Sequence, residues 1–146
     1  MIYTKSKIKI IGISGSLREY SFSEKTLEYT LKKIETIKIS ENLNVDTEKI
    51  DIKKLNIPLF NPDNNYSNHE DVSFIREKFK NANGIIISTP EYHGSISGII
   101  KNILDFLDKD YIENKIIMGI SVMGGINSND SINHMRDIIN KLKGWF

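Results

Sequence analysis

The sequence predicts an α/β fold in which a parallel sheet carries helices on both faces. Two observations lead to this prediction. Three short runs of mostly apolar residues rich in isoleucine, near 8–13, 84–90 and 115–122, are typical of strands, and the first two are typical of buried ones. Between and after these runs, apolar residues recur at helical spacing, so strands alternate with helices. Parallel sheets of this kind bind ligands beyond the carboxyl ends of their strands, at the loops that follow.

The first forty residues predict a strand, a tight loop and a helix. Four isoleucines lie within 8–13, and this run stops at a loop of glycine and serine. A helix over 22–37 follows, because its apolar residues recur every three or four positions on one face. Ser21 and Glu24 stand three residues apart at the start of this helix. They form the pattern of a capping box, in which each side chain bonds the backbone amide of the other residue.

The remaining elements continue this alternation. Each strand is predicted from apolar residues at every second position or in a short continuous run, and each helix from apolar residues on one face. In order, the sequence predicts a half-exposed strand at 43–52, a polar surface excursion at 61–71, a helix at 72–79, a strand at 84–90, a helix at 99–107, a strand at 115–122 and a helix at 132–142.

Length, charge and composition narrow the possible functions. The chain has 146 residues without a linker or repeat, so a single domain over 1–146 is expected. Twenty basic residues balance 19 acidic ones, so we expect no binding of nucleic acid and no membrane surface as partner. The absence of cysteine excludes disulfides, thiolate metal sites and cysteine nucleophiles. No apolar segment is long enough to span a membrane and no signal peptide is recognisable, so a soluble cytoplasmic protein is expected.

The loop after the first strand has the composition of an anion-binding site. Ser14, Ser16, Ser21, Ser23 and Arg18 lie with two glycines between a strand and a helix start. Glycine lets the backbone approach a ligand, free amides and hydroxyls donate to a dianion, and a guanidinium adds charge. The dinucleotide fingerprint and the P-loop both fail here, because the residues that they require are missing. A single phosphate monoester remains as ligand; the alternative is a turn whose serines only cap the helix.

Two later loops follow the third and fourth predicted strands and should lie at the same edge of the sheet. A planar heteroaromatic ring placed there could stack near a tyrosine and accept hydrogen bonds from backbone amides, which glycine brings close. The alternative is that both loops are ordinary turns. The residues concerned are Pro90, Glu91, Tyr92, His93, Gly94, Gly124 and Gly125.

Four segments together resemble the NADPH-dependent FMN reductase family, flavodoxin-like flavoproteins that include azoreductases and quinone reductases. They are GSLREYS at 15–21, LNIPLFNPD at 55–63, PEYHGSISGIIKNILDFL at 90–107 and Gly-Gly at 124–125. The third segment is the most specific, because it joins the loop to a helix that carries Gly98, Lys101, Asn102 and Asp105. The resemblance extends over about 7–142.

The resemblance implies a flavodoxin-like three-layer fold with a parallel sheet of strand order 2-1-3-4-5. The family has its fifth strand after the last helix, whereas this sequence ends at 144–146, where that strand should begin. We therefore expect four full strands and at most a stub of a truncated fifth. The resemblance also implies a homodimer or homotetramer, with Lys101, Asn102 and Asp105 as structural or interfacial residues.

The resemblance further implies FMN as cofactor and assigns the loop residues to it. Ser23 stands where the family often has asparagine, so its contact departs from the usual pattern. The implied phosphate ligands are Ser14, Ser16, Arg18, Ser21 and Ser23. The residues implied to border the ribityl chain and the isoalloxazine ring are Pro90, Glu91, Tyr92, His93 and Gly94, with Gly124 and Gly125 near the pyrimidine end.

The implied activity is that of an FMN-dependent oxidoreductase. NADPH or NADH would give a hydride to FMN, and a small acceptor such as a quinone, an azo compound or free flavin would then take the electrons. Hydride transfer itself needs no side-chain acid or base, so no catalytic residue is expected. The alternative is a flavodoxin-type single-electron carrier, which the balanced charge disfavours. A hydrolase is disfavoured because GISGS does not match the nucleophile elbow, and no metal is expected because no metal-ligand spacing is present.

Overall fold

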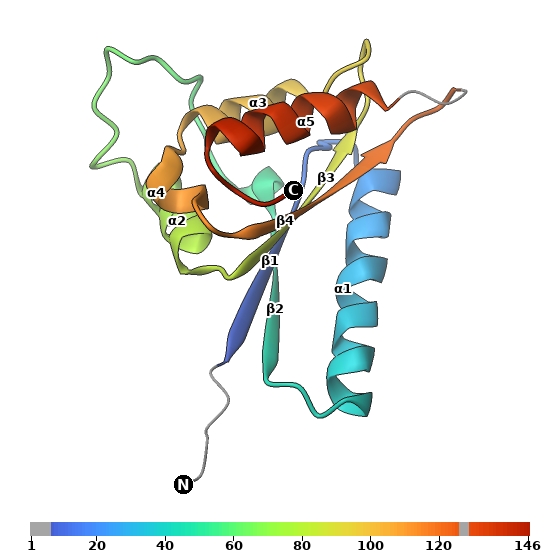
Figure 1. Ribbon diagram of the computed structural model, residues 1–146. Helices are drawn as coiled ribbons and strands as arrows, with labels where there is room; N and C mark the ends of the chain where they lie inside the picture. The colour runs from blue at the N-terminus through green and yellow to red at the C-terminus, as the bar shows by residue number, and fades with distance from the viewer. Residues whose placement is uncertain (1–6, 126–128) are drawn as a thin grey trace, which may run out of the picture.

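The computed structural model describes residues 7–125 and 129–146, and these form a parallel sheet between two layers of helices (Figure 1). The sheet has the order β2-β1-β3-β4, which confirms the strand order implied by the resemblance. The strands are β1(Ile8–Ser14), β2(Val45–Ile50), β3(Gly84–Pro90) and β4(Ile116–Val122).

The register of the strands brings their carboxyl ends to one edge of the sheet. Ser14 of β1 lies opposite Ser88 of β3, and Pro90 of β3 lies opposite Val122 of β4. Each of these strands is followed by one of the three loops singled out in the sequence. The predicted meeting of the three loops at one edge is therefore confirmed.

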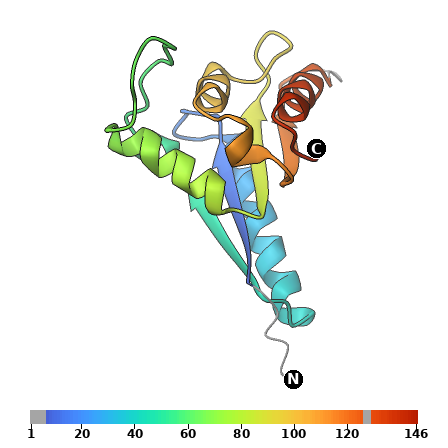
Figure 2. The same ribbon diagram turned by 60° about the vertical axis from the view of Figure 1, so that its left-hand side comes forward.

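Helices cover the two faces of the sheet unequally, as the turned view shows (Figure 2). Among the described residues, one face is covered by α1 and the other by α2, α3 and α5. Over residues 7–125 and 129–146, no helix is both long and apolar enough to cross a bilayer. The helices are α1(Phe22–Ser40), α2(Glu70–Asn81), α3(Gly98–Asp105), α4(Lys109–Ile112) and α5(Asp130–Lys141), with a short 3-10 helix η1(Ile52–Lys54).

Strand β3 shows how the core divides between these layers. Ile85 and Ile87 belong to the large cluster with α2, α3 and α5, whereas Ile86 packs with Leu27 and Leu31 of α1. Neighbouring side chains of a strand point to opposite faces, so a continuous run of isoleucines fills both layers. This confirms that the strand is buried on both sides.

The second strand is shorter than the predicted range of 43–52. It ends at Ile50, because the Asp51 carboxylate accepts a hydrogen bond from the amide of Lys53 and begins η1 there. Neither η1 nor α4 was predicted, since three or four residues are too few to show helical spacing.

The polar segment between η1 and α2 is fastened to α3. The side chain of Asn102 accepts a hydrogen bond from the amide of Phe60 (2.8 Å) and donates one to the carbonyl of Pro58 (2.8 Å). The rings of Phe60 and Tyr66 each pack edge-on against Phe106. These contacts make Asn102 a structural residue.

Replacing Asn102 with alanine should loosen the segment over 55–63. The amide of Phe60 and the carbonyl of Pro58 would lose their partner, which should lower the free energy of unfolding by about 1–3 kcal/mol. Denaturant titration measures this loss, and hydrogen exchange should be fastest where the segment has come free.

The matched control is Lys101→Ala on the same helix. Lys101 is exposed and forms an ion pair with Asp105, and such a pair contributes only about 0.2–0.5 kcal/mol. Equal destabilisation by the Lys101 and Asn102 variants would contradict a specific role for Asn102.

The last residues of the chain lie beside β4. Trp145 forms an isolated parallel bridge with Ile116: its amide donates to the carbonyl of Lys115 (2.8 Å), and its carbonyl accepts from the amide of Ile117 (2.7 Å). Trp145 thus occupies the place of a fifth strand, and the predicted stub is present.

Candidate functional site

A cleft of about 410 Å³ lies at the carboxyl ends of β1, β3 and β4. Its walls come from the loop after each of these strands and from the first turn of α1. Eight residues predicted from the sequence line it: Ser16, Arg18, Ser21, Ser23, Pro90, Glu91, Tyr92 and Gly124. The structure thus brings most of the predicted site together in one concave place.

Four predicted site residues do not line this cleft. Ser14 lies beneath the first loop, next to Glu24, and its buried hydroxyl has no hydrogen-bond partner among residues 7–125 and 129–146. His93 and Gly94 form the tip of a turn, with φ of 52° and 71°, and Gly125 is exposed beyond the cleft. Their predicted contacts with a ligand remain predictions.

Four further residues line the cleft that the sequence pattern does not predict: Tyr20, Phe22, Val122 and Met123. Tyr20 and Phe22 are 78% and 74% exposed. Two aromatic residues beside a glycine-rich loop and a helix start were a usable signal, because large exposed apolar side chains often mark binding surfaces. Val122 and Met123 carry no such signal, because they line the cleft only as a result of where β4 ends in the fold.

The start of α1 presents unused hydrogen-bond donors to the cleft. Ser21 is the N-cap, and its hydroxyl accepts from the amide of Glu24 (3.1 Å). Within the described part of the chain, the amides of Phe22 and Ser23 donate to no protein acceptor. Free amides and the helix dipole both favour an anion at this position.

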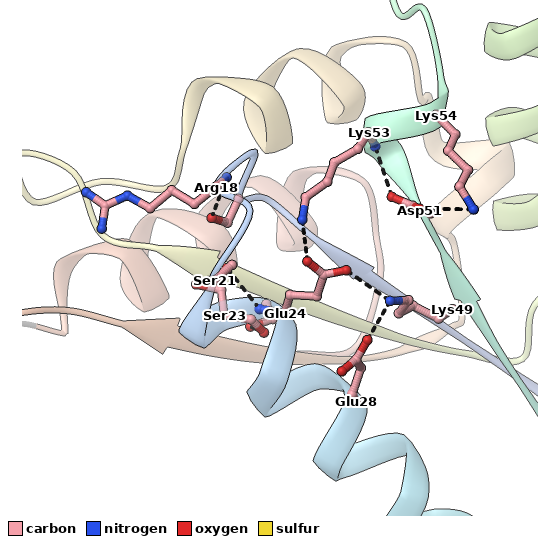
Figure 3. Close-up of polar contacts among 11 residues, drawn as sticks. Arg18, Ser21, Ser23, Glu24, Glu28, Lys49, Asp51, Lys53 and Lys54 are labelled. Carbon is pink, nitrogen blue, oxygen red and sulfur yellow. Dashed lines mark hydrogen bonds and ion pairs between the residues drawn. The ribbon is translucent and has the colours of Figure 1, made fainter.

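Arg18 adds a positive charge at the same place. Its backbone amide donates to the Ser16 hydroxyl (3.4 Å), which bends the loop. The guanidinium extends away from the carboxylates of Glu24, Glu28 and Asp51 (Figure 3), and no residue in 7–125 or 129–146 forms an ion pair with it. An Arg side chain without a protein partner is available for bidentate binding of a phosphate.

Glycine is required in the first loop by close packing. A side chain on Gly15 would place its Cβ 2.3 Å from Ile100 Cγ1 and 2.5 Å from Ser97 Oγ, both at the start of α3. The amide of Gly15 also donates to the carbonyl of Ser88 on β3 (2.7 Å). The loop is therefore held against the sheet and α3 before any ligand binds.

The loop after β3 is held by Glu91. One carboxylate oxygen of Glu91 accepts from the Ser131 hydroxyl (2.8 Å) and from the Ser131 amide (3.3 Å) at the start of α5. The same hydroxyl lies 2.7 Å from the hydroxyl of Ser121 on β4. Tyr92 and Ser95 close the turn with two backbone hydrogen bonds. Glu91 thus fixes the loop, and the half-exposed Tyr92 is left on the cleft wall.

The cleft fits a ligand with a phosphate and a flat ring. The free amides of α1 and the Arg18 guanidinium supply donors and charge for the phosphate, and Tyr92 supplies an aromatic surface. At Gly124 an added Cβ would meet nothing within 4 Å among the described residues, so their packing leaves room for a ligand there.

Comparison with curated proteins finds an FMN-dependent NADPH-azoreductase of Staphylococcus aureus (strain USA300), 44% identical over 70 residues. The match covers 48% of this chain and 37% of the relative, so it spans just over a third of that protein.

Solved structures show the same fold. An oxidoreductase from Corynebacterium diphtheriae has a TM-score of 0.83 at 14% identity, covering 96% of this chain and 78% of its own. An FMN-dependent NADH-azoreductase from Bacillus anthracis in complex with FMN has a TM-score of 0.66 at 18% identity, covering 94% and 82%.

The model of one family, described as NADPH-dependent FMN reductase, matches residues 8–146. This range includes all four segments in which the sequence resembles that family, and the resemblance is thereby confirmed. The chain belongs to the NADPH-dependent FMN reductase family.

Proposed function

We propose that this chain binds FMN and passes a hydride from NADPH or NADH through it to a small acceptor, such as a quinone, an azo compound or free flavin. The observation that carries this proposal is the meeting of free α1 amides, the Arg18 guanidinium and the Tyr92 ring around one cleft. Family membership supports the proposal. When bound, FMN would supply the redox chemistry by accepting and returning a hydride.

The first loop would hold the phosphate. The amides of Phe22 and Ser23 would donate to it, and the hydroxyls of Ser16, Ser21 and Ser23 would add short polar contacts. Arg18 would neutralise its charge. Of the predicted phosphate ligands, Ser14 lies beneath this loop, and its contact with the phosphate stays a prediction.

The later loops would position the ring. Pro90 and Tyr92 line the cleft, and Glu91 would act by fixing their loop to α5. His93 and Gly94 would shape the turn, while the amides of Gly124 and Gly125 would donate to the electron-rich edge of the ring.

The proposal includes a homodimer or homotetramer. Leu17, Tyr20 and Phe22 are all largely exposed around the phosphate loop, and a second subunit would cover such apolar side chains. Static light scattering on the FMN-loaded protein would measure the mass of the assembly.

A spectroscopic experiment tests the proposed function directly. The purified protein is saturated with FMN, freed of excess, and mixed without oxygen with NADPH and, separately, with NADH. We expect the visible absorbance of FMN to bleach with at least one nicotinamide and to return when a quinone is added. A protein that keeps no FMN, or whose FMN is reduced by dithionite but by neither nicotinamide, would contradict the proposal; the second result would favour a single-electron carrier.

A further inference from the structure

The capping box predicted at the start of α1 is only half formed. The Ser21 hydroxyl accepts from the amide of Glu24, as the pattern predicts. The second half would have the Glu24 carboxylate accept from the amide of Ser21, and the described structure contains no such bond. A strong local preference has therefore been overridden by contacts from elsewhere in the fold.

Two lysines provide those contacts. Lys49 at the end of β2 donates to one Glu24 oxygen (2.9 Å), and Lys53 of η1 donates to the other. Lys49 also pairs with Glu28, one turn further along α1 (2.6 Å). Figure 3 shows the Glu24 carboxylate turned towards both lysines, while the Arg18 guanidinium extends in the other direction.

The network of Glu24 with Lys49 and Lys53 is partly buried, and the charges within it stabilise one another. The Glu24 side chain is 19% exposed, and both lysines keep less than a third of their side-chain surface in solvent. The hydrogen bonds from Lys53 and then Lys49 lower the pKa of Glu24 below its usual value. The carboxylate is therefore ionised at neutral pH, and without the lysines a full negative charge would stand beside the proposed phosphate site.

We propose that Lys49 and Lys53 hold the Glu24 carboxylate off the amides at the start of α1, so that these donors stay available to the phosphate of the ligand. This inference rests on the proposed binding of FMN. In a complete capping box the Glu24 carboxylate would bind the amide of Ser21, next to the free amides of Phe22 and Ser23, and its charge would repel an anion bound there. By occupying both carboxylate oxygens, the lysines prevent this repulsion.

The inference predicts a specific pattern of FMN affinities. The double variant Lys49→Met/Lys53→Met should bind FMN about five- to tenfold more weakly, as expected for a carboxylate that repels an anion at a helix N-terminus. Its affinity for riboflavin, which has the same ring without the phosphate, should not change. Adding Glu24→Ala should return FMN affinity to within about twofold of wild type. Flavin fluorescence titration measures all of these dissociation constants.

Matched controls separate this effect from a general loss of positive charge. Lys54 and Lys38 form ion pairs with Asp51 and Glu35, and neither contacts Glu24. The variant Lys38→Met/Lys54→Met should therefore bind FMN as wild type does. Thermal melting by circular dichroism verifies folding, and if the Lys49/Lys53 variant does not fold, Lys53→Met is compared with Lys54→Met instead.

The outcomes distinguish the inference from the proposed function. If wild type does not bind FMN, the proposed function fails and the inference fails with it. If wild type binds FMN but Glu24→Ala does not relieve the loss in the double variant, the lysines act by direct attraction and the inference alone is overturned. Equal losses for FMN and riboflavin would likewise overturn it, because the phosphate would then not be involved.

Discussion

Arg18→Ala should weaken FMN binding by about ten- to a hundredfold, the cost of a lost charge-assisted hydrogen bond to a phosphate. The guanidinium has no ion-pair partner among residues 7–125 and 129–146, so its removal leaves no protein carboxylate unpaired. Folding stability should therefore stay close to that of wild type while FMN affinity falls. Fluorescence titration with FMN and with riboflavin measures the effect, and only FMN should be affected.

The control for this prediction is Arg136→Ala. Arg136 is an exposed arginine on α5 that donates to Asn133 and lies over the ring of Phe146, and it does not line the cleft. Its removal changes the net charge by the same amount, so FMN affinity should be unaffected. The role given to Arg18 would be wrong if the two variants bound FMN equally well.

Gly15→Ala should damage both folding and FMN binding. The new methyl group would stand 2.3 Å from Ile100 Cγ1 and 2.5 Å from Ser97 Oγ, so the loop or α3 must shift. Overpacking of this kind costs about 1–3 kcal/mol of the free energy of unfolding. Because the same loop carries Ser16 and Arg18, its displacement should also weaken FMN binding. Denaturant titration and FMN titration give the two values.

Gly98→Ala tests the same contact region from the other side. Gly98 is the first residue of α3, and an added Cβ there meets nothing within 4 Å in the part of the chain that the structure describes. Alanine restricts the unfolded chain more than glycine does, so this variant should be neutral or more stable by about 0.4–1 kcal/mol. If Gly15→Ala were as stable as Gly98→Ala, the loop would not be packed against α3 as described.

Much of the fold could be predicted because β1 and β3 are largely buried and β4 is apolar, although Ile116 and Met118 of β4 are exposed. β1, β3 and β4 are short continuous apolar runs, and the loops after them concentrate glycine and serine, so both their type and their common edge follow from the sequence. The second strand was predicted too long, because its end depends on the Asp51 carboxylate and not on a change in hydrophobic spacing.

The sequence predicts which residues belong to the candidate site better than it predicts where their side chains point. Ser14 shows why: it shares a face of β1 with Gly12, whose Cβ position meets Leu27 and Leu31 of α1. The Ser14 hydroxyl therefore points beneath α1 rather than into the cleft. The face that α1 covers depends on the whole sheet, so it cannot be predicted from residues 8–21 alone.

The half-formed capping box likewise shows that contacts distant in the sequence decide where a charged side chain points. The spacing of Ser21 and Glu24 predicts two hydrogen bonds, and only the one from the Glu24 amide to the Ser21 hydroxyl forms. The other half depends on lysines that are 25 and 29 residues further along the chain. They reach Glu24 only because β2 lies beside β1 and η1 follows at its end.

Gly124 and Gly125 lie at the edge of the sheet, at positions where the fold does not require glycine. Neither has a positive φ, and an added Cβ at either would meet no atom of residues 7–125 or 129–146 within 4 Å. Substitutions at these two positions are thus free of the steric penalty that applies at Gly15. Sequence changes at these two positions should therefore leave the thermal stability of the scaffold nearly unchanged.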